Sequence, residues 1–508
     1  MFDESFAFPR SLPAPTDRAG GRVAVIGSGV AGLVCAYELQ RRGLDVVLYE
    51  RANQPGGRVR THRFWDGTHA DLGAMRIPGN HHCVLHYITE FGLATRPFVN
   101  ANPDAYYHLR GRRARVREAP ALFPAFALRP GERQAPARLL DDLLRVVWQT
   151  LTLDQQRRVL AGRWDDAVLD RLASVSLWQF VDERLSQDAW DLVGHASGLA
   201  HYEQSSLLEV LVDYFGLFHV GQLELVDGMD ALVRAFVRAL RPRTLCLSTT
   251  VTELVVTEGG VLVLGRRIDG PLDERFDFVV CCVPAPALDQ ISFTPALPHA
   301  QRHAIRGISY ASSTKTLLHL TRRRWELDDR IFGGGSFTDL PIQQCWYPSD
   351  NARRIEDGLD GAAPERWGAR DPRRCEEPAA LLGAYQWGAN ARRTAALPDA
   401  ERDRLVLNCL DRLHPGIAAD VDDIVHWNWD DQLGGGAFAH LPPGEHSRYL
   451  AVLGAPHPAD DPLVFFAGEH LSGAHAWCQG AAQSALGAVG RLLDRARPAP
   501  LATQMEAA

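Results

Sequence analysis

A glycine-rich turn between two apolar runs near the start of the sequence constrains the fold more than any other feature. The turn Gly27-Ser28-Gly29-Val30-Ala31-Gly32 has the form G-x-G-x-x-G and follows the apolar run 23–26. Residues 33–42 can form a helix, and a second apolar run, 46–49, leads into Glu50. Unbroken apolar runs are typical of buried parallel strands. The pattern predicts a unit in which the glycines let a dinucleotide pyrophosphate approach a helix N-terminus, while Glu50 accepts from a ribose hydroxyl.

Composition excludes several other classes of protein. The 508 residues are 46% hydrophobic and 23% charged, which is typical of a globular protein. The net charge of −8 argues against a nucleic-acid-binding surface, and the sequence has no run of about 18 apolar residues that would predict a membrane span. The N-terminus has no signal-peptide pattern, and the nine cysteines form no C-x-x-C pair. We expect a cytoplasmic protein with mostly buried, reduced thiols and no metal site.

The middle of the sequence differs from its two ends. Residues 122–204 contain almost no strand pattern, and Leu, Val and Trp recur there at helical spacing. Short β-rich runs return at 244–264, 276–283 and 310–320. A last buried strand is predicted at 463–466, followed by a helix to about residue 495. We expect strands from both ends of the chain to join one sheet, so that the domains are discontinuous in sequence.

Two further motifs indicate which dinucleotide is bound. Gly56-Gly57-Arg58 follows Glu50 closely, and Gly468-Glu469 stands between a predicted strand and a predicted helix near the C-terminus. With the first turn, and in this order, they resemble the flavin monoamine oxidase superfamily. The resemblance implies FAD, with Arg58 near the diphosphate, Glu469 at the ribityl chain, and a helix N-terminus facing the flavin ring. Further cofactor contacts predicted with it are Arg51, Gly73, Ala74, Met75, Arg76, Val251, Trp477 and Ala481.

The resemblance also implies a mixed α/β fold. It has a Rossmann-type FAD-binding domain, a β-rich substrate-binding domain and a helical insertion. We predict the FAD-binding domain at 20–62, 229–306 and 455–495, the substrate-binding domain at 1–19, 63–115, 216–228 and 307–454, and the helical domain at 116–215. By analogy with the same family we expect a homodimer.

The segment Asp71-Leu72-Gly73-Ala74-Met75-Arg76-Ile77-Pro78 indicates the branch of the family. It resembles the Gly-(Ala/Pro)-Met-Arg-(Leu/Ile)-Pro motif of L-amino acid oxidases and the related tryptophan 2-monooxygenases. The resemblance implies that Arg76 projects into the cavity and clamps a substrate carboxylate in a bidentate manner. The alternative for Arg76 is a structural ion pair, in a chain that is rich in arginine.

Other segments predict the remaining contacts of the substrate. Tyr347 lies in Trp346-Tyr347-Pro348, after a Thr-Asp-Leu-Pro run that resembles the amino acid oxidases, and could donate to the carboxylate beside Arg76. Trp346 and Tyr347 alternate on a strand, so only one can face inward, and a packing pair is the alternative. The resemblance implies that the backbone of Ala476 accepts from the substrate amine. It also implies that Trp477, Ala437 and, as a weaker candidate, Trp429 line the pocket.

The side-chain preference cannot be read from the sequence. Trp and Phe near the pocket motifs favour bulky or aromatic substrates, while Trp387 is expected in the core. Glu203 or Asp213 could pair a cationic side chain, although a solvated or helix-end acid is the favoured interpretation of each. His81 and His82 have no partners at metal-ligand spacing, so we interpret them as polar residues at a helix start.

These motifs lead to a hypothesis about the reaction. An FAD-dependent L-amino acid oxidase would transfer hydride from Cα to flavin N5, hydrolyse the imino acid to a 2-oxo acid and ammonia, and reduce O2 to H2O2. The alternatives are an L-amino acid 2-monooxygenase, which decarboxylates to an amide, and a biosynthetic flavin amine oxidase acting on a larger amine. A non-enzymatic flavin-binding protein is the least favoured.

Lys315 is the single lysine among 54 Lys and Arg residues. It lies in the β-rich run Ala311-Ser312-Ser313-Thr314-Lys315-Thr316-Leu317-Leu318, where a half-buried ammonium needs partners or a function. The resembling family has a lysine in this strand that holds a water against flavin N5. A compact three-donor ammonium suits such a water better than the planar fork of arginine. We predict that Lys315 is catalytic and assists the reaction with oxygen or the hydrolysis of the imine.

Overall fold

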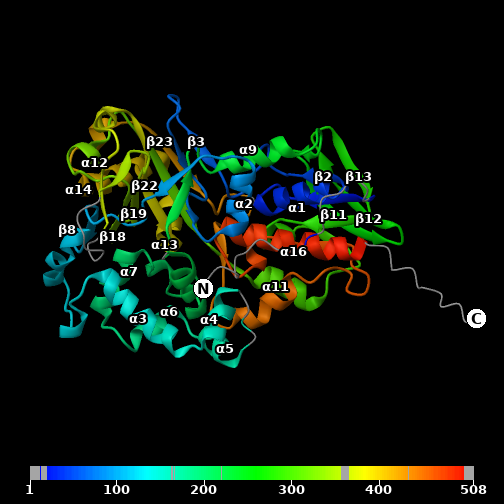
Figure 1. The fold of residues 1–508 in the computed structure, drawn as a ribbon, viewed down its shortest axis with the longest axis horizontal. Coiled ribbons are helices and arrows are strands. Elements are labelled where there is room, and N and C mark those ends of the chain that lie inside the picture. The colour runs from blue at the N-terminus through cyan, green and yellow to red at the C-terminus, as the bar shows by residue number, and fades with distance from the viewer. Residues whose placement is uncertain are drawn as a thin grey trace, which may run out of the picture.

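The computed structural model describes residues 12, 20–161, 164, 166–218, 220–355, 365–432 and 434–496. Residues 1–11 and 13–19 of the predicted substrate-binding domain lie outside this part of the chain. Figure 1 shows three regions, in which elements from distant parts of the sequence lie together. Blue, green and red elements form the region at right, yellow strands and helices form the region at upper left, and cyan helices lie below them.

A five-stranded parallel sheet organises the first region. Strand β1 (Arg22–Ile26) pairs with β2 (Asp45–Tyr49) on one side and with β14 (Phe278–Cys281) on the other, and β14 pairs with β25 (Val464–Phe466). The prediction that strands from both ends of the chain join one sheet is therefore confirmed. The strands, in spatial order, are β10 (Leu245–Cys246), β2 (Asp45–Tyr49), β1 (Arg22–Ile26), β14 (Phe278–Cys281) and β25 (Val464–Phe466).

Both faces of this sheet are covered, which explains why its strands are unbroken apolar runs. Side chains alternate along β1: Val23 and Val25 face helices, while Ala24 and Ile26 face a second sheet. Helices α1 (Val30–Arg41), α9 (Asp230–Ala239) and α16 (Cys478–Ala496) pack on the first face, with α1 and α16 side by side. The second sheet consists of β13 (Gly270–Phe276), β12 (Gly260–Arg267), β11 (Thr250–Thr257) and β15 (Ser292–Thr294).

A seven-stranded sheet forms the second region. Its central strands β17 and β22 pair in antiparallel fashion, and every residue of β17 is buried. The strand predicted around Lys315 is thus confirmed. In spatial order the strands are β23 (Val421–Asn428), β17 (Ser313–Leu320), β22 (Ala379–Trp387), β19 (Gln344–Tyr347), β18 (Gly334–Thr338), β7 (Tyr106–Leu109) and β8 (Arg112–Arg115).

Short strands and helices complete these two regions. A three-stranded sheet joins β5 (Ile77–Pro78), β9 (Gln222–Leu225) and β6 (Thr95–Phe98), and a pair joins β16 (Ser309–Ala311) and β24 (Phe438–His440). The other two pairs are β3 (Thr61–Arg63) with β4 (His69–Asp71), and β20 (Ala352–Ile355) with β21 (Arg366–Ala369). The helices are α2 (His82–Glu90), α10 (Ala285–Leu288), α11 (His299–Gly307), α12 (Arg324–Leu327), α13 (Gly388–Ala395), α14 (Asp399–Leu413) and α15 (Ala451–Leu453).

The third region is helical, as the sequence predicted for this part of the chain. Its helices bury a core of their own, in which Trp190 is completely enclosed. Apolar side chains at helical spacing form this core, so each helix presents one face to its neighbours. The helices are α3 (Pro136–Thr150), α4 (Leu153–Leu160), α5 (Ala167–Ala173), α6 (Leu177–Asp182), α7 (Gln187–Ser197), α8 (Leu207–Leu211) and the π-helix η4 (Val212–Phe218).

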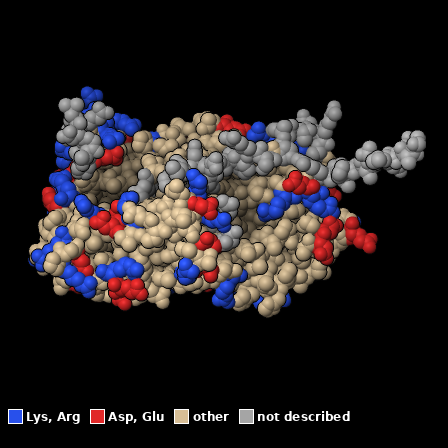
Figure 2. Space-filling view, turned by 60° about the horizontal axis from the view of Figure 1, so that its bottom comes forward, with Lys and Arg blue, Asp and Glu red and all other residues tan. Residues whose placement is uncertain are grey.

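The distribution of surface charge and the burial of the cysteines are those of an ordinary globular protein. On the face shown in Figure 2, acidic and basic side chains alternate over the surface and neither sign forms a continuous area. All nine cysteines are free, and seven of them are buried, as expected from the sequence. Within the described ranges, none of the helices is both long and apolar enough to cross a membrane.

Candidate active site

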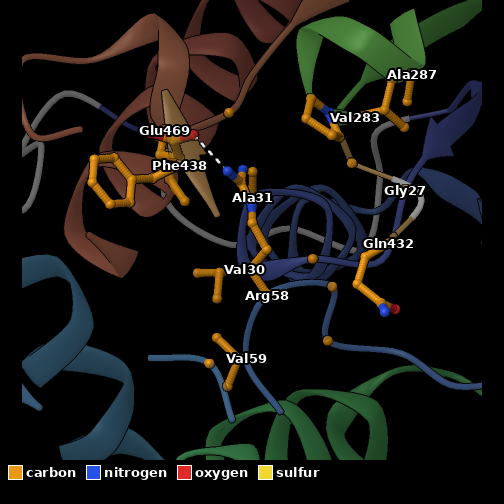
Figure 3. A pocket seen from close by; sticks show the side chains of 18 of the residues that line it. Gly27, Val30, Ala31, Arg58, Val59, Val283, Ala287, Gln432, Phe438 and Glu469 are labelled. Carbon is orange, nitrogen blue, oxygen red and sulfur yellow. Dashed lines mark hydrogen bonds and ion pairs between the residues drawn. The ribbon is translucent and has the colours of Figure 1, made fainter. Parts of the chain in front are cut away.

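A cavity of about 650 Å³ lies at the carboxyl ends of β1, β2, β14 and β25. Parallel α/β sheets bind ligands at this edge. The cavity continues to the seven-stranded sheet and to the helical region, which add Lys315, Tyr385 and Asp213 to its wall. Figure 3 shows its sheet-side wall, with Gly27 and Ala31 on the first turn and Val283 and Ala287 after β14. One space is therefore shared by all three regions.

The N-terminus of α1 faces the sheet end of this cavity. Its N-cap, Gly29, has extended backbone, and no side chain caps the helix or places an acid in its first turn. The exposed N–H groups and the helix dipole therefore favour an anion here. Gly32 explains the tight turn, because a Cβ there would lie 1.8 Å from the carbonyl oxygen of Gly27. Gly27, Gly29 and Ala31 line the cavity, as predicted cofactor contacts should.

Glu50 is held at the end of β2 with its carboxylate on the cavity wall. Its Oε2 accepts from the backbone N and from Oγ of Ser28, both at 2.8 Å, and its Oε1 accepts from the backbone N of Ala52 at 2.8 Å. Ser28 is completely buried, and neither Ser28 nor Gly32 lines the cavity. In the structure Ser28 orients Glu50 and Gly32 packs the helix on the strand, and the cofactor contacts predicted for these two residues stay predictions.

A half-buried ion pair crosses the cavity wall between Arg58, whose side chain is 26% exposed, and Glu469, which is buried. Nη1 of Arg58 donates to Oε1 of Glu469 at 2.8 Å and to the carbonyl of Ala437 at 3.2 Å, and Figure 3 shows Arg58 and Glu469 pointing toward one another. Oε2 of Glu469 accepts from the backbone N of Ala476 at 3.1 Å. Burial alone would raise the pKa of Glu469, but Arg58 and nearby histidines hold it below its usual value. The pair ties three distant segments together beside the predicted flavin.

A second helix N-terminus reaches the same cavity. Ala476 has φ of +68°, a conformation that a non-glycine residue adopts rarely, and it leads into α16. Trp477 and Ala481 line the cavity, and the first turn of α16 carries no acid. The dipole of α16 therefore favours negative charge where the resemblance places the flavin ring. The other predicted cofactor contacts on the wall are Arg51, Gly57, Gly73, Ala74, Met75, Arg76, Val251 and Gly468.

Lys315 is buried under the loop that carries Arg76. Its Nζ donates to the carbonyls of Asp71 at 3.0 Å and Gly73 at 2.7 Å, and it lies 4.5 Å from the ring centre of Tyr385. The pKa of Lys315 is lowered to about 7, mainly by burial, while the charge of Asp71 opposes the change and that of Arg76 adds to it. Lys315 can therefore gain or lose a proton at Nζ near neutral pH, while it also lines the cavity.

Arg76 lies in the cavity wall among aromatic rings. Nη1 of Arg76 donates to Oδ1 of Asn100 at 2.7 Å, and its Cζ lies 5.1 Å from the ring centre of Trp346 and 5.9 Å from that of Trp477. Burial lowers the pKa of Arg76, so an anion beside it would offset the cost of burying its charge. This geometry suits a carboxylate.

Tyr347 is not brought to Arg76, which corrects a prediction. On β19 it is Trp346 that faces Arg76, and Tyr347 points to the other side of the sheet. The hydroxyl of Tyr347 bonds to Oγ of Ser336 at 2.6 Å and to Nε2 of His414 at 2.7 Å. The rule that only one of these two neighbours can face inward was right, but the wrong neighbour was chosen.

Several wall residues were missed or misjudged from the sequence. Tyr385 pairs with Lys315 across β17 and β22, and it lines the cavity, whereas Tyr347 does not. Trp387 lines the cavity instead of lying only in the core, and Asp213 lies in the wall instead of in solvent. The segment Gly-Ala-Tyr-Gln-Trp-Gly at 383–388 was the available signal for Tyr385 and Trp387. Ala437, Trp429, Ala476 and Trp477 are on the wall, as predicted.

The fold and the cavity together define an oxidoreductase of the dinucleotide-binding Rossmann type. Residues 30–493 match the sequence model described as flavin containing amine oxidoreductase, and the chain belongs to this family. The L-amino-acid oxidase of Crotalus adamanteus is 29% identical over 94% of this chain and 88% of its own. The L-amino-acid oxidase of Demansia vestigiata is 28% identical over 95% of this chain and 89% of its own.

Solved structures of amine oxidases share the fold. Putrescine oxidase, in a complex with putrescine, has a TM-score of 0.73 at 19% identity and covers 94% of this chain and 99% of its own. Cyclohexylamine oxidase from Brevibacterium oxydans has a TM-score of 0.71 at 20% identity and covers 93% of this chain and 99% of its own. The predicted fold class, family and enzyme class are thus confirmed.

FAD is the cofactor of this chain, as predicted, and the cavity residues fit it. Two helix N-termini without acids face positions for the diphosphate and for a reduced flavin ring. Glu50 still has lone pairs for ribose hydroxyls after accepting from Ser28 and Ala52. Arg58 adds a cation to the same wall.

Proposed function

We propose that this protein is an FAD-dependent L-amino acid oxidase that converts an L-amino acid to a 2-oxo acid, ammonia and H2O2. One observation carries the proposal: the guanidinium of Arg76 lies in the wall of the cavity that holds the dinucleotide site. A simple amine has no carboxylate to meet such a cation. The similarity to L-amino-acid oxidases over most of the chain supports the same assignment.

The residues of the chain bind and orient the substrate in this proposal. Arg76 binds the α-carboxylate through its planar guanidinium, and Tyr385, across the same wall, donates its phenol to it. Trp477 packs against the bound substrate and excludes water from one side. FAD, when bound, accepts the two electrons of the substrate Cα–H bond as a hydride and passes them to O2.

Lys315 holds or moves a proton at Nζ during this reaction. Its Nζ donates to carbonyls of the loop that carries Arg76, and its pKa of about 7 lets both protonation states exist at neutral pH. As an ammonium, Lys315 directs its three N–H groups to the carbonyls of Asp71 and Gly73 and to Sδ of Met75 at 3.5 Å, so it is the neutral amine that can accept a proton from a water in the cavity. We propose this role as the catalytic contribution of the single lysine.

Peroxide release across the twenty L-amino acids, with the D-enantiomers as controls, tests the proposed function. We expect H2O2, ammonia and the 2-oxo acid in equal amounts from at least one L-amino acid, and none from its D-form. CO2 and an amide as products would instead indicate a 2-monooxygenase. An FAD-containing protein that turns over no free L-amino acid would contradict the proposal and favour a larger amine as substrate.

We also propose a homodimer in the cytoplasm. None of the nine cysteines, all in the described part of the chain, forms a disulfide, which supports a reducing compartment. The dimer is supported by family analogy alone. Light scattering of the purified holoenzyme measures the oligomeric state, and fractionation of the source cells measures the location. A monomeric mass or a secreted protein would contradict these proposals.

A further inference from the structure

Asp213 brings a half-buried carboxylate to the substrate end of the cavity. It lies in the π-helix η4 of the helical region, and it lines the same cavity as Arg76. Oδ1 of Asp213 accepts from Nε1 of Trp477 at 3.1 Å, and Oδ2 accepts from the hydroxyl of Tyr202 at 3.4 Å. Two donors leave lone pairs of the carboxylate available, since a carboxylate has about four acceptor sites. Asp213 can therefore accept further hydrogen bonds from a ligand in the cavity.

Trp477 lies against both charges of this part of the cavity. The centre of its ring is 5.9 Å from Cζ of Arg76, and its Nε1 is the atom that donates to Asp213. A ligand that packs on Trp477 is thus close to a guanidinium and to a carboxylate. An α-amino acid bound to Arg76 by its own carboxylate can direct its side chain toward Asp213.

The surroundings of Asp213 stabilise its charge only in part. Burial and the nearby Glu209 raise the pKa of Asp213 to about 7, although Trp477, His475 and Tyr202 oppose the change. Glu209 itself is already engaged, because Nε2 of His446 lies 2.9 Å and Nδ1 of His475 lies 3.0 Å from its Oε1. Among the described residues, Asp213 has no ion-pair partner within 4.0 Å. A buried carboxylate without a cation is costly, and a cationic ligand would reduce that cost.

Aromatic side chains surround the same end of the cavity. Tyr202, Trp387, Phe438 and Trp477 all line it. Aromatic rings attract a cation over their faces, so rings next to a carboxylate form a favourable site for an ammonium or guanidinium group. A purely aromatic substrate would use the rings but would leave the carboxylate of Asp213 without a counter-charge.

We propose that the preferred substrates are L-amino acids with a cationic side chain, such as L-lysine, L-ornithine and L-arginine, and that Asp213 selects them. Arg76 binds the α-carboxylate, and Asp213 binds the distal ammonium or guanidinium against the rings of Trp477 and Tyr202. The inference rests on the proposed oxidase function and deepens it by naming the substrate class.

The test compares L-lysine with L-norleucine, which has the same four side-chain carbons but a hydrogen in place of the distal ammonium. We measure kcat/KM from peroxide release by the holoenzyme and by Asp213→Asn, which keeps the shape and an acceptor for Trp477. The wild type should prefer L-lysine, and Asp213→Asn should lower the ratio of the two kcat/KM values by about 100-fold, because a buried charge pair is lost. The kcat/KM for L-norleucine should change by less than about 3-fold.

Glu203→Gln is the matched control, because Glu203 lies ten positions before Asp213, off the cavity wall, where it accepts from Nε1 of Trp190. It should leave the ratio unchanged. Equal losses on both substrates in Asp213→Asn would overturn the inference, since Asp213 would then only position Trp477. A wild-type preference for L-norleucine would also overturn it, even if the variant failed to fold, and would leave the proposed oxidase function intact. Oxidation of no L-amino acid would overturn both.

Discussion

The two ends of the cavity are built in different ways. At the dinucleotide end the wall is mostly backbone, with Gly27, Gly29 and Gly57 next to one helix N-terminus. At the substrate end it is made of charges and rings that come from three separate regions of the fold. The first end is specified by neighbours in sequence, whereas the second depends on which faces of distant strands and helices meet. Cofactor binding and substrate choice should therefore respond to different substitutions.

The largest effect is expected at the substrate end, from Arg76→Ala. The variant should lose about 1000-fold in kcat/KM for its best L-amino acid, because the α-carboxylate loses a bidentate, charge-assisted partner. It should still contain FAD, since the dinucleotide end is unchanged. Steady-state peroxide assays and flavin absorption measure the two properties, with the exposed Arg112→Ala as control. Near wild-type kcat/KM would show that Arg76 does not bind the carboxylate.

Arg58→Met tests the dinucleotide end. It leaves Glu469 buried without its guanidinium, so the free energy of unfolding should fall by about 3 kcal/mol and FAD should be lost more readily. Arg63→Met is the matched control, because Arg63 pairs with Asp230 at the surface and should contribute less than about 1 kcal/mol. Denaturant unfolding and FAD content measure the difference. Equal destabilisation by the two variants would contradict the role given to the pair of Arg58 and Glu469.

Lys315→Met tests the proposed catalytic role of Lys315, which lies between the dinucleotide end and the substrate end of the cavity. Reoxidation of the reduced enzyme by O2 should slow by about 100-fold, while the affinity for the amino acid should change little, because Lys315 acts on protons and not on the carboxylate. Stopped-flow mixing of the reduced variant with O2 measures this step separately from substrate binding. Unchanged oxygen kinetics would reduce Lys315 to a structural residue.

We also predict how the stability of this variant depends on pH. The pKa of Lys315 is about 7 in the folded protein and about 10.5 in the unfolded chain. Between these values the unfolded chain binds the proton that the folded protein has lost, so the free energy of unfolding rises with pH. Below pH 7 the wild type must keep a charged Lys315 buried, and the variant does not. The free energy of unfolding of Lys315→Met relative to that of the wild type should therefore be highest below pH 7 and should fall by at least about 2 kcal/mol by pH 10. Denaturant unfolding at both pH values measures this, and a constant difference would contradict it.

The smallest effects are expected from two tyrosine variants, one in the cavity wall (Tyr385) and one behind the sheet (Tyr347). Tyr385→Phe should raise KM by about 10-fold, because it removes a hydrogen bond to a charged group. Tyr347→Phe should leave KM within about 2-fold but cost about 1 kcal/mol of stability, since Ser336 and His414 lose a buried partner. Steady-state kinetics and thermal unfolding distinguish them. Equal effects on KM would contradict the placement of Tyr347 behind the sheet.

Sequence reasoning succeeded where a feature is local. The turn at 27–32, the end of β2 at Glu50 and the strand of Lys315 each depend on neighbouring residues, and the structure places them as expected. It failed for Tyr347, because alternation tells that two neighbours face opposite ways but not which one faces Arg76. Asp213 was undervalued because nothing nearby in the sequence shows that Trp477, 264 positions away, packs against it.

The ion pair between Arg58 and Glu469 also bears on how the enzyme is made. The two residues are 411 positions apart, and Glu469 follows β25. A growing chain that has made the turn at 27–32 and Arg58 therefore still lacks the helix N-terminus of α16 and the carboxylate that pairs with Arg58. The complete FAD site can form only after residues up to α16 have been synthesised, and until then the apolar face of α1 against which α16 packs is uncovered.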